Sequence, residues 1–178
     1  MPEEGSAFRG EGGNTLKAKA LKKGDRIGLV APASGLYNRS YVDRTVEALK
    51  EWGYEAVLGE NVKGKYGFFS APDDARAREF NQMFARDDID GIFVTCGGYG
   101  SARILDKIDY EIIAEHPKVF LGFSDITTLH LAIYKKTGLV TFHGPGSASF
   151  PAETLTDYTR EYLEKALVRK DPIGVIPL

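Results

Sequence analysis

Short apolar runs that alternate with helical segments constrain the fold of this chain more than any other feature of its sequence. Strands are expected at 26–31, 54–58, 91–96, 118–123 and 139–142, and helices at 39–53, 72–86, after 101, and at 109–115, 125–137 and 153–169. The strand runs are continuously apolar, which is typical of strands buried on both faces. The sequence therefore predicts an α/β fold with an open, mainly parallel sheet and helices on both faces.

Composition excludes several classes of function. The chain has 178 residues, which suits one domain with a core, and a formal net charge of −2. That charge gives no electrostatic reason to expect nucleic acid or an anionic membrane as a partner. No apolar run approaches the roughly 18 residues that cross a bilayer, and the N-terminus lacks the apolar segment of a signal peptide. We therefore expect a cytoplasmic protein without a membrane partner.

The pattern also suggests how the chain is divided. Residues 1–15 are rich in Gly and Glu without periodicity, so we expect a flexible tail. Residues 16–150 carry the alternating pattern and form the predicted α/β domain. Residues 151–178 are expected to hold a terminal helix and the start of a linker.

Four loops that follow predicted strands contain most of the candidate functional residues. They are PASG at 32–35, GGYGS at 97–101, Ser124-Asp125, and HGPGS at 143–147. Open parallel sheets bind ligands at the carboxyl ends of their strands. We therefore expect these loops to meet at one edge of the sheet and to form the site there.

The glycine-rich segment 97–101 has two interpretations. Glycines at the start of a helix let backbone N–H groups approach a phosphate, so the segment could cradle one. The established nucleotide-binding spacings are absent, however. The alternative is a tight strand-to-helix turn with Ser101 as the helix N-cap.

Ser124 also has two interpretations. A strand, a sharp turn with a serine at its apex, and a helix resemble a nucleophile elbow, although Ile126 stands where the familiar pattern has a glycine. The alternative is that Ser124 or Asp125 caps the helix, which is the commoner role of such residues.

A serine nucleophile needs a base, and the three histidines offer no clear one. His116 precedes a strand and His130 lies too far along its helix, so only His143 is expected at the correct edge. No carboxylate stands out to orient it. Cys96 ends a predicted strand at the same edge and is a rival nucleophile, although a buried structural cysteine is the simpler interpretation.

Four segments together resemble the N-terminal domain of the LD-carboxypeptidases, the serine peptidases of muropeptide recycling, whose relatives include microcin-immunity carboxypeptidases. They are LKKGDRIGLVAPASG (21–35), DDIDGIFVTCGGYGSARIL (87–105), KVFLGFSDITTLHLAIY (118–134) and LVTFHGP (139–145). The resemblance covers about residues 16–150. It implies a flavodoxin-like or class I amidotransferase-like α/β domain.

The resemblance also implies roles for individual residues. Ser124 matches the nucleophile, and the N–H groups of Asp125 and of the Gly97-Gly98 turn match the oxyanion hole. We expect Tyr99 and His143 to contact substrate. No metal or cofactor is implied.

The implied reaction releases a terminal D-amino acid, typically D-Ala, from L,D-linked muropeptides. In the family the Glu and His of the triad come from a C-terminal domain, so we expect this chain to be inactive alone and the full-length protein to be a homodimer. One departure bears on substrate preference, because Cys96 stands where family members often carry Arg. The alternatives are a non-catalytic module that binds muropeptides or acyl-nucleotides, and an amidotransferase-like thiol enzyme that uses Cys96.

Overall fold

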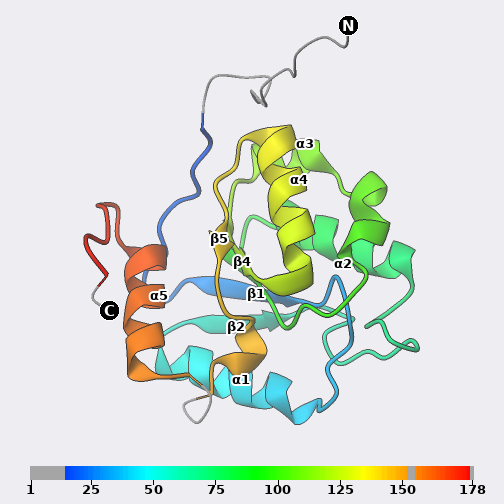
Figure 1. Ribbon diagram of the computed structural model, residues 1–178, viewed down its shortest axis with the longest axis horizontal. Coiled ribbons are helices and arrows are strands. Elements are labelled where there is room, and N and C mark those ends of the chain that lie inside the picture. The colour runs from blue at the N-terminus through cyan, green and yellow to red at the C-terminus, as the bar shows by residue number, and fades with distance from the viewer. Residues whose placement is uncertain (1–14, 152–154, 177–178) are drawn as a thin grey trace, which may run out of the picture.

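The five strands form one sheet in which every neighbouring pair is parallel. The computed structural model describes residues 15–151 and 155–176. The strand order is β2-β1-β3-β4-β5 (Figure 1). The strands are β1 (Arg26–Val30), β2 (Glu55–Leu58), β3 (Gly91–Val94), β4 (Val119–Gly122) and β5 (Phe142–His143). The predicted α/β class is confirmed. The order reverses between β1 and β3, which is where folds of this kind bind ligands.

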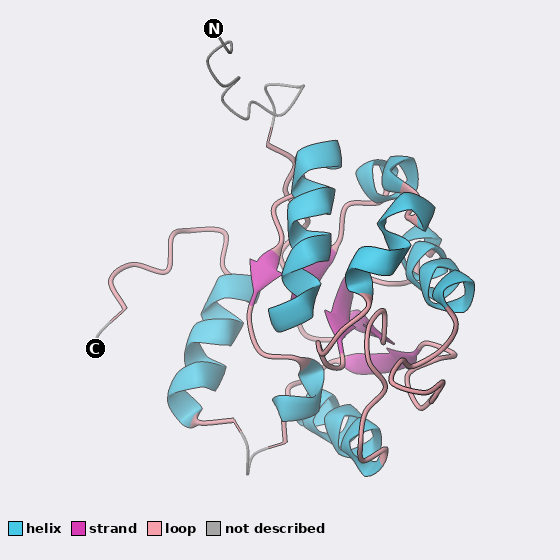
Figure 2. Ribbon diagram, turned by 45° about the vertical axis from the view of Figure 1, so that its right-hand side comes forward, coloured by secondary structure: helices cyan, strands magenta, loops and turns pink. Residues whose placement is uncertain are grey.

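Helices cover both faces of the sheet (Figures 1 and 2). One face packs against α2 (Asp73–Ala85), the 3-10 helix η1 (Ser101–Lys107), α3 (Tyr110–Glu115) and α4 (Thr127–Thr137). The other face packs against α1 (Ser40–Glu51), the 3-10 helix η3 (Ser147–Ser149) and α5 (Asp157–Val168). The sheet is therefore the middle of three layers.

Successive residues of the central strands enter opposite layers, as the period of a β-strand requires. Ile92 and Val94 of β3 pack against the α2 layer, whereas Phe93 between them packs against the α1 layer. In β4, Phe120 and Leu121 divide in the same way. This explains why both strands read as continuously apolar: each face needs its own apolar set.

The structure corrects three of the predicted elements. The last strand is β5, not 139–142, because Leu139 bridges to Leu16 outside the sheet. The helix after residue 101 is a 3-10 helix. The last helix begins at Asp157, where the Thr156 side chain accepts a hydrogen bond from the N–H of Thr159.

Two remaining expectations concern the chain termini and membranes. Apart from Thr15, the predicted tail at 1–15 lies outside the described residues. Among the residues that are described, no helix is long and apolar enough to span a membrane.

Candidate active site

Ser124 stands at the carboxyl end of β4 in an unusual backbone conformation. Its φ is 61°, and it is the one residue other than glycine with a positive φ in the described ranges 15–151 and 155–176. A β-carbon in this region is crowded by the backbone, so the conformation costs about 1–2 kcal/mol. The turn leads from β4 into the short 3-10 helix Ser124–Ile126 and then into α4, and it leaves Ser124 exposed. The expected strand, sharp turn and helix are all present.

Neither Ser124 nor Asp125 caps a helix. The residues at the cap positions of the 3-10 helix and of α4 are Phe123 and Ile126, and neither position has a side-chain cap. The Asp125 carboxylate instead accepts a hydrogen bond from the N–H of Ser101 at 2.9 Å. Within the described chain, the Ser124 hydroxyl has no hydrogen-bond partner, so its oxygen is free to meet a ligand.

Ser101 does not cap its helix either. Its hydroxyl donates a 2.7 Å hydrogen bond to the carbonyl of Asp125, and η1 has no side-chain cap. Together with the bond from the Ser101 N–H to the Asp125 carboxylate, this contact fastens the glycine-rich turn to the turn that carries Ser124.

The glycine-rich turn is held against the loop after β1. The Ser34 hydroxyl accepts a hydrogen bond from the N–H of Tyr99 at 3.0 Å, and the Ser34 N–H donates to the carbonyl of Gly97 at 3.2 Å. Gly98 has a φ of 95°, which L side chains rarely adopt, and a β-carbon there would lie 2.3 Å from Ser34 Oγ. The close approach of the two loops therefore requires glycine at 98.

Gly97 lies directly against the Ser124 turn. A β-carbon on Gly97 would lie 2.9 Å from the β-carbon of Ser124 and 3.2 Å from the backbone nitrogen of Asp125. The missing side chain thus leaves room for a ligand atom within hydrogen-bonding distance of the Asp125 N–H. Gly97, Ser124 and Asp125, which were predicted to share the site, are adjacent.

The histidines occupy three different environments. His130 is buried, and its ring nitrogens contact the Gly122 carbonyl and the Thr141 hydroxyl, each at 2.9 Å. Burial lowers the pKa of His130, so its imidazole is neutral and structural. His143 ends β5 beside Gly122 and is exposed. In the described residues no hydrogen bond joins either ring to Ser124.

His116 is remote from this edge. It follows α3, and its Nδ1 lies 3.2 Å from a carboxylate oxygen of Asp87, near the amino ends of the strands. Among the described residues, no cluster of His, Cys, Asp and Glu has the arrangement of a metal site.

Cys96 does not have the environment of an activated thiol. Its sulfur lies 3.4 Å from the carbonyl of Ser34, and burial raises the pKa of the thiol. A raised pKa disfavours the reactive thiolate at neutral pH. The environment therefore favours the structural interpretation of Cys96.

Arg76 is a supporting residue that the sequence reasoning missed. Its side chain is 0% exposed and donates hydrogen bonds to the carbonyls of Pro32, Ala71 (3.0 Å) and Gly100 (2.9 Å). These carbonyls belong to three separate loops at the carboxyl edge of the sheet. Arg76 lies four residues before Phe80 on the inward face of α2, and that spacing is the signal that could have revealed its burial.

Comparison with known proteins gives a consistent result. Residues 27–144 match the family described as the LD-carboxypeptidase N-terminal domain. A probable murein peptide carboxypeptidase of Bacillus subtilis (strain 168) is 44% identical over 129 residues, which are 72% of this chain and 40% of the relative. The microcin C7 self-immunity protein MccF of Escherichia coli is 39% identical over 161 residues, which are 87% of this chain and 46% of the relative.

Solved structures of similar proteins have the same fold. An MccF-like protein from Bacillus anthracis str. Ames has a TM-score of 0.86 at 34% identity, covering 92% of this chain and 50% of that one. MccF in complex with aspartyl sulfamoyl adenosine has a TM-score of 0.83 at 36% identity, covering 88% and 48%. The chain spans about half the length, or less, of the proteins it matches.

Proposed function

Because this chain belongs to the LD-carboxypeptidase family, we propose that it carries the nucleophile of a serine LD-carboxypeptidase. The proposed substrate is an L,D-linked muropeptide, from which a terminal D-amino acid, typically D-Ala, is released during peptidoglycan recycling. The observation that best supports this role is the exposed Ser124 held at a φ of 61° at the carboxyl end of β4. Strained residues other than glycine concentrate at functional sites, and this one makes no capping bond that would explain it.

The proposed chemistry is acyl transfer to Ser124 and then to water. The Ser124 oxygen attacks the carbonyl carbon of the terminal peptide bond and loses its proton to a base. The N–H groups of Asp125, Gly97 and Gly98 would stabilise the negative oxygen that forms. The C–N bond then breaks, the D-amino acid leaves with the proton, and water hydrolyses the acyl-serine.

We further propose that the base comes from outside the described residues. His130 is committed to Gly122 and Thr141, and His143 makes no hydrogen bond to Ser124 within the described chain. Without a base the hydroxyl is a weak nucleophile at neutral pH, so we expect the 178-residue chain to be inactive by itself. A cytoplasmic location remains a prediction from the sequence pattern, and a homodimeric full-length form remains a prediction that rests on the family resemblance.

Hydrolysis of a D-Ala-terminated tetrapeptide tests this proposal. D-Ala release is measured for the chain alone and for the chain mixed with the C-terminal half of the Bacillus subtilis relative, each beside a Ser124→Ala control. We expect release only from the mixture and only with Ser124 intact. Turnover by the chain alone that disappears in His143→Ala would refute the missing-base argument.

A second candidate function is a non-catalytic module that binds muropeptides or acyl-nucleotides. Two observations favour it: MccF has been solved with aspartyl sulfamoyl adenosine, and the side chains of Tyr66, Phe68 and Tyr99 are more than half exposed. Titration with a D-Ala-terminated peptide and with an aminoacyl sulfamoyl adenosine distinguishes the two functions. Binding that survives Ser124→Ala, without hydrolysis in the mixture, would favour the binding module.

A further inference from the structure

A cavity with a volume of about 420 Å³ opens at the opposite edge of the sheet from Ser124. Its apolar lining includes Val119 and Phe142, the first residues of β4 and β5, together with Val140 and Leu167. Val119 and Leu167 are almost fully buried, so they form a floor. This volume lies within the range of small-molecule sites, roughly 300–1,000 Å³.

Four cationic side chains surround this apolar floor. Lys17 and Lys19 come from the segment before β1, and Arg169 and Lys170 follow α5. All four are exposed, and none has a carboxylate within ion-pair distance in the described chain. Four like charges around one cavity repel one another, and a bound anion would remove that repulsion.

Several cations elsewhere on the described surface are paired. Lys63 pairs with Asp43 and Lys107 with Asp74, and Lys165, one turn before Arg169, pairs with Glu161. Glu164, the acid of α5 nearest to Arg169 in sequence, pairs with Arg160. Exposed cations without an ion pair also occur elsewhere in the described chain, as at Lys50 and Lys65. The cavity differs in that four such cations line one apolar floor, in a chain that is slightly acidic as a whole.

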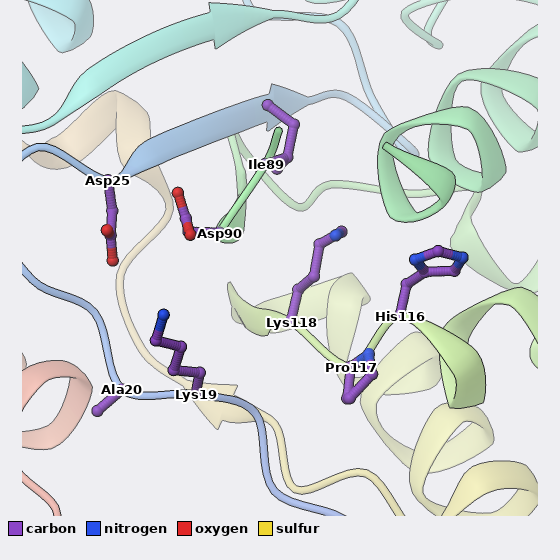
Figure 3. Close-up of a pocket in the computed structure, with 8 residues that line it drawn as sticks. All are labelled: Lys19, Ala20, Asp25, Ile89, Asp90, His116, Pro117 and Lys118. Carbon is purple, nitrogen blue, oxygen red and sulfur yellow. The ribbon is translucent and has the colours of Figure 1, made fainter. Parts of the chain in front are cut away.

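A smaller neighbouring cavity of about 150 Å³ is lined by side chains of both charges (Figure 3). Lys19 and Ala20 line both cavities, but the smaller one also contains Asp25, Asp90, His116 and Lys118. Lys19 extends toward these two carboxylates (Figure 3). No acid of the described chain lines the larger cavity, so an anion there avoids the repulsion that Asp25 and Asp90 would exert in the smaller one.

We propose that the larger cavity binds a small amphiphilic anion, with an alkyl or aryl body on the apolar floor and a carboxylate or phosphate between the cations. Burial of the apolar body supplies the non-directional part of the affinity. Lysine and arginine supply charge-assisted hydrogen bonds to the anionic head. This site is separate from Ser124 and does not depend on the proposed peptidase activity.

Chemical-shift titration of the 178-residue chain tests the proposal with four probes of equal chain length. Hexanoate and hexyl phosphate carry the two anionic heads, hexanol is neutral, and hexylammonium is cationic. We expect saturable shifts at the amides of Val119, Val140 and Leu167 with the anions, at least about tenfold weaker binding of hexanol, and no binding of hexylammonium. The stronger of the two anions identifies the head group.

Two variants and a matched control separate charge from cavity volume. Arg169→Gln/Lys170→Gln should weaken anion binding about tenfold or more. Lys50→Gln/Lys65→Gln, which removes the same charge from exposed sites that do not line the cavity, should leave it unchanged. Ala166→Leu keeps every charge but narrows the cavity and should also weaken binding. Equal binding of hexanol and hexanoate, or equal losses in both double variants, would overturn the proposal.

Discussion

Replacement of Arg76 by Met should destabilise the fold by about 3–5 kcal/mol. The guanidinium is fully buried, and its loss leaves the carbonyls of Pro32, Ala71 and Gly100 without their donor. Each buried acceptor left unpaired costs about 1–3 kcal/mol, and water that enters the vacated space satisfies part of the demand. Met retains much of the apolar stem, so the change tests the hydrogen bonds and the charge rather than a large cavity.

Arg103 provides a matched control. Arg76 also pairs with the Asp73 carboxylate, and Arg103 pairs with it at 2.7 Å. Both guanidinium groups lie over the Phe69 ring, with the guanidinium carbon 4.9 Å from the ring centroid in Arg76 and 5.3 Å in Arg103. The Arg103 side chain is 49% exposed and forms no hydrogen bond to a backbone carbonyl in the described chain. Because exposed ion pairs contribute little, Arg103→Met should cost at most about 1 kcal/mol.

Urea denaturation of the two variants and the parent chain measures the difference in the free energy of unfolding. Equal m-values are required, because a changed m-value would indicate an altered unfolded state or an intermediate. A cost for Arg76→Met no greater than that for Arg103→Met would refute the inference that the buried guanidinium holds the three loops together.

Three further predictions concern the turn that carries Ser124. Ser124→Gly should stabilise the fold by about 0.5–1 kcal/mol, as measured by urea denaturation, because glycine adopts a φ of 61° without a β-carbon clash. Ser124→Ala keeps the β-carbon and should give no such gain. Burial lowers the pKa of His130 in the folded state, so the unfolded state binds this proton first as pH falls below the ordinary pKa of 6.5. The free energy of unfolding should therefore drop below that pH, by at most about 1.4 kcal/mol per pH unit. The drop should be smaller in His130→Gln. In the mixture of this chain with the C-terminal half of the Bacillus subtilis relative, Gly97→Ala should lower kcat by about tenfold or more while the fold is retained, because the added methyl group fills the space beside the Asp125 N–H. An unchanged kcat would show that this space takes no part in the reaction.

The sequence was sufficient for the parts of the fold that depend on local pattern. The apolar runs around Phe93 and Phe120 predicted central parallel strands. Because the loops at the carboxyl ends of parallel strands meet at one edge of the sheet, the sequence also predicted that residues 97–101 lie beside Ser124. The position of β5 could not be predicted, because Leu139 has the composition of a strand residue but bridges to Leu16, a distant partner.

The supporting contacts of the site were also beyond local pattern. The burial of Arg76 depends on acceptors contributed by three loops far apart in the sequence. Ser34 was placed at the correct edge, but its role as an acceptor for the Tyr99 N–H depends on the approach of two loops. Long-range contacts of this kind are set by the tertiary fold rather than by neighbouring residues.

The positive φ of Ser124 also limits which side chains can act as a nucleophile at this turn. A β-branched residue is strongly disfavoured in that region of backbone space, because its second branch meets the chain where serine has only hydrogen atoms. Threonine carries the same hydroxyl but is excluded by this steric demand, whereas serine and cysteine have the unbranched β-carbon that the turn accepts. The backbone thus selects the shape of the nucleophile before any chemical requirement does.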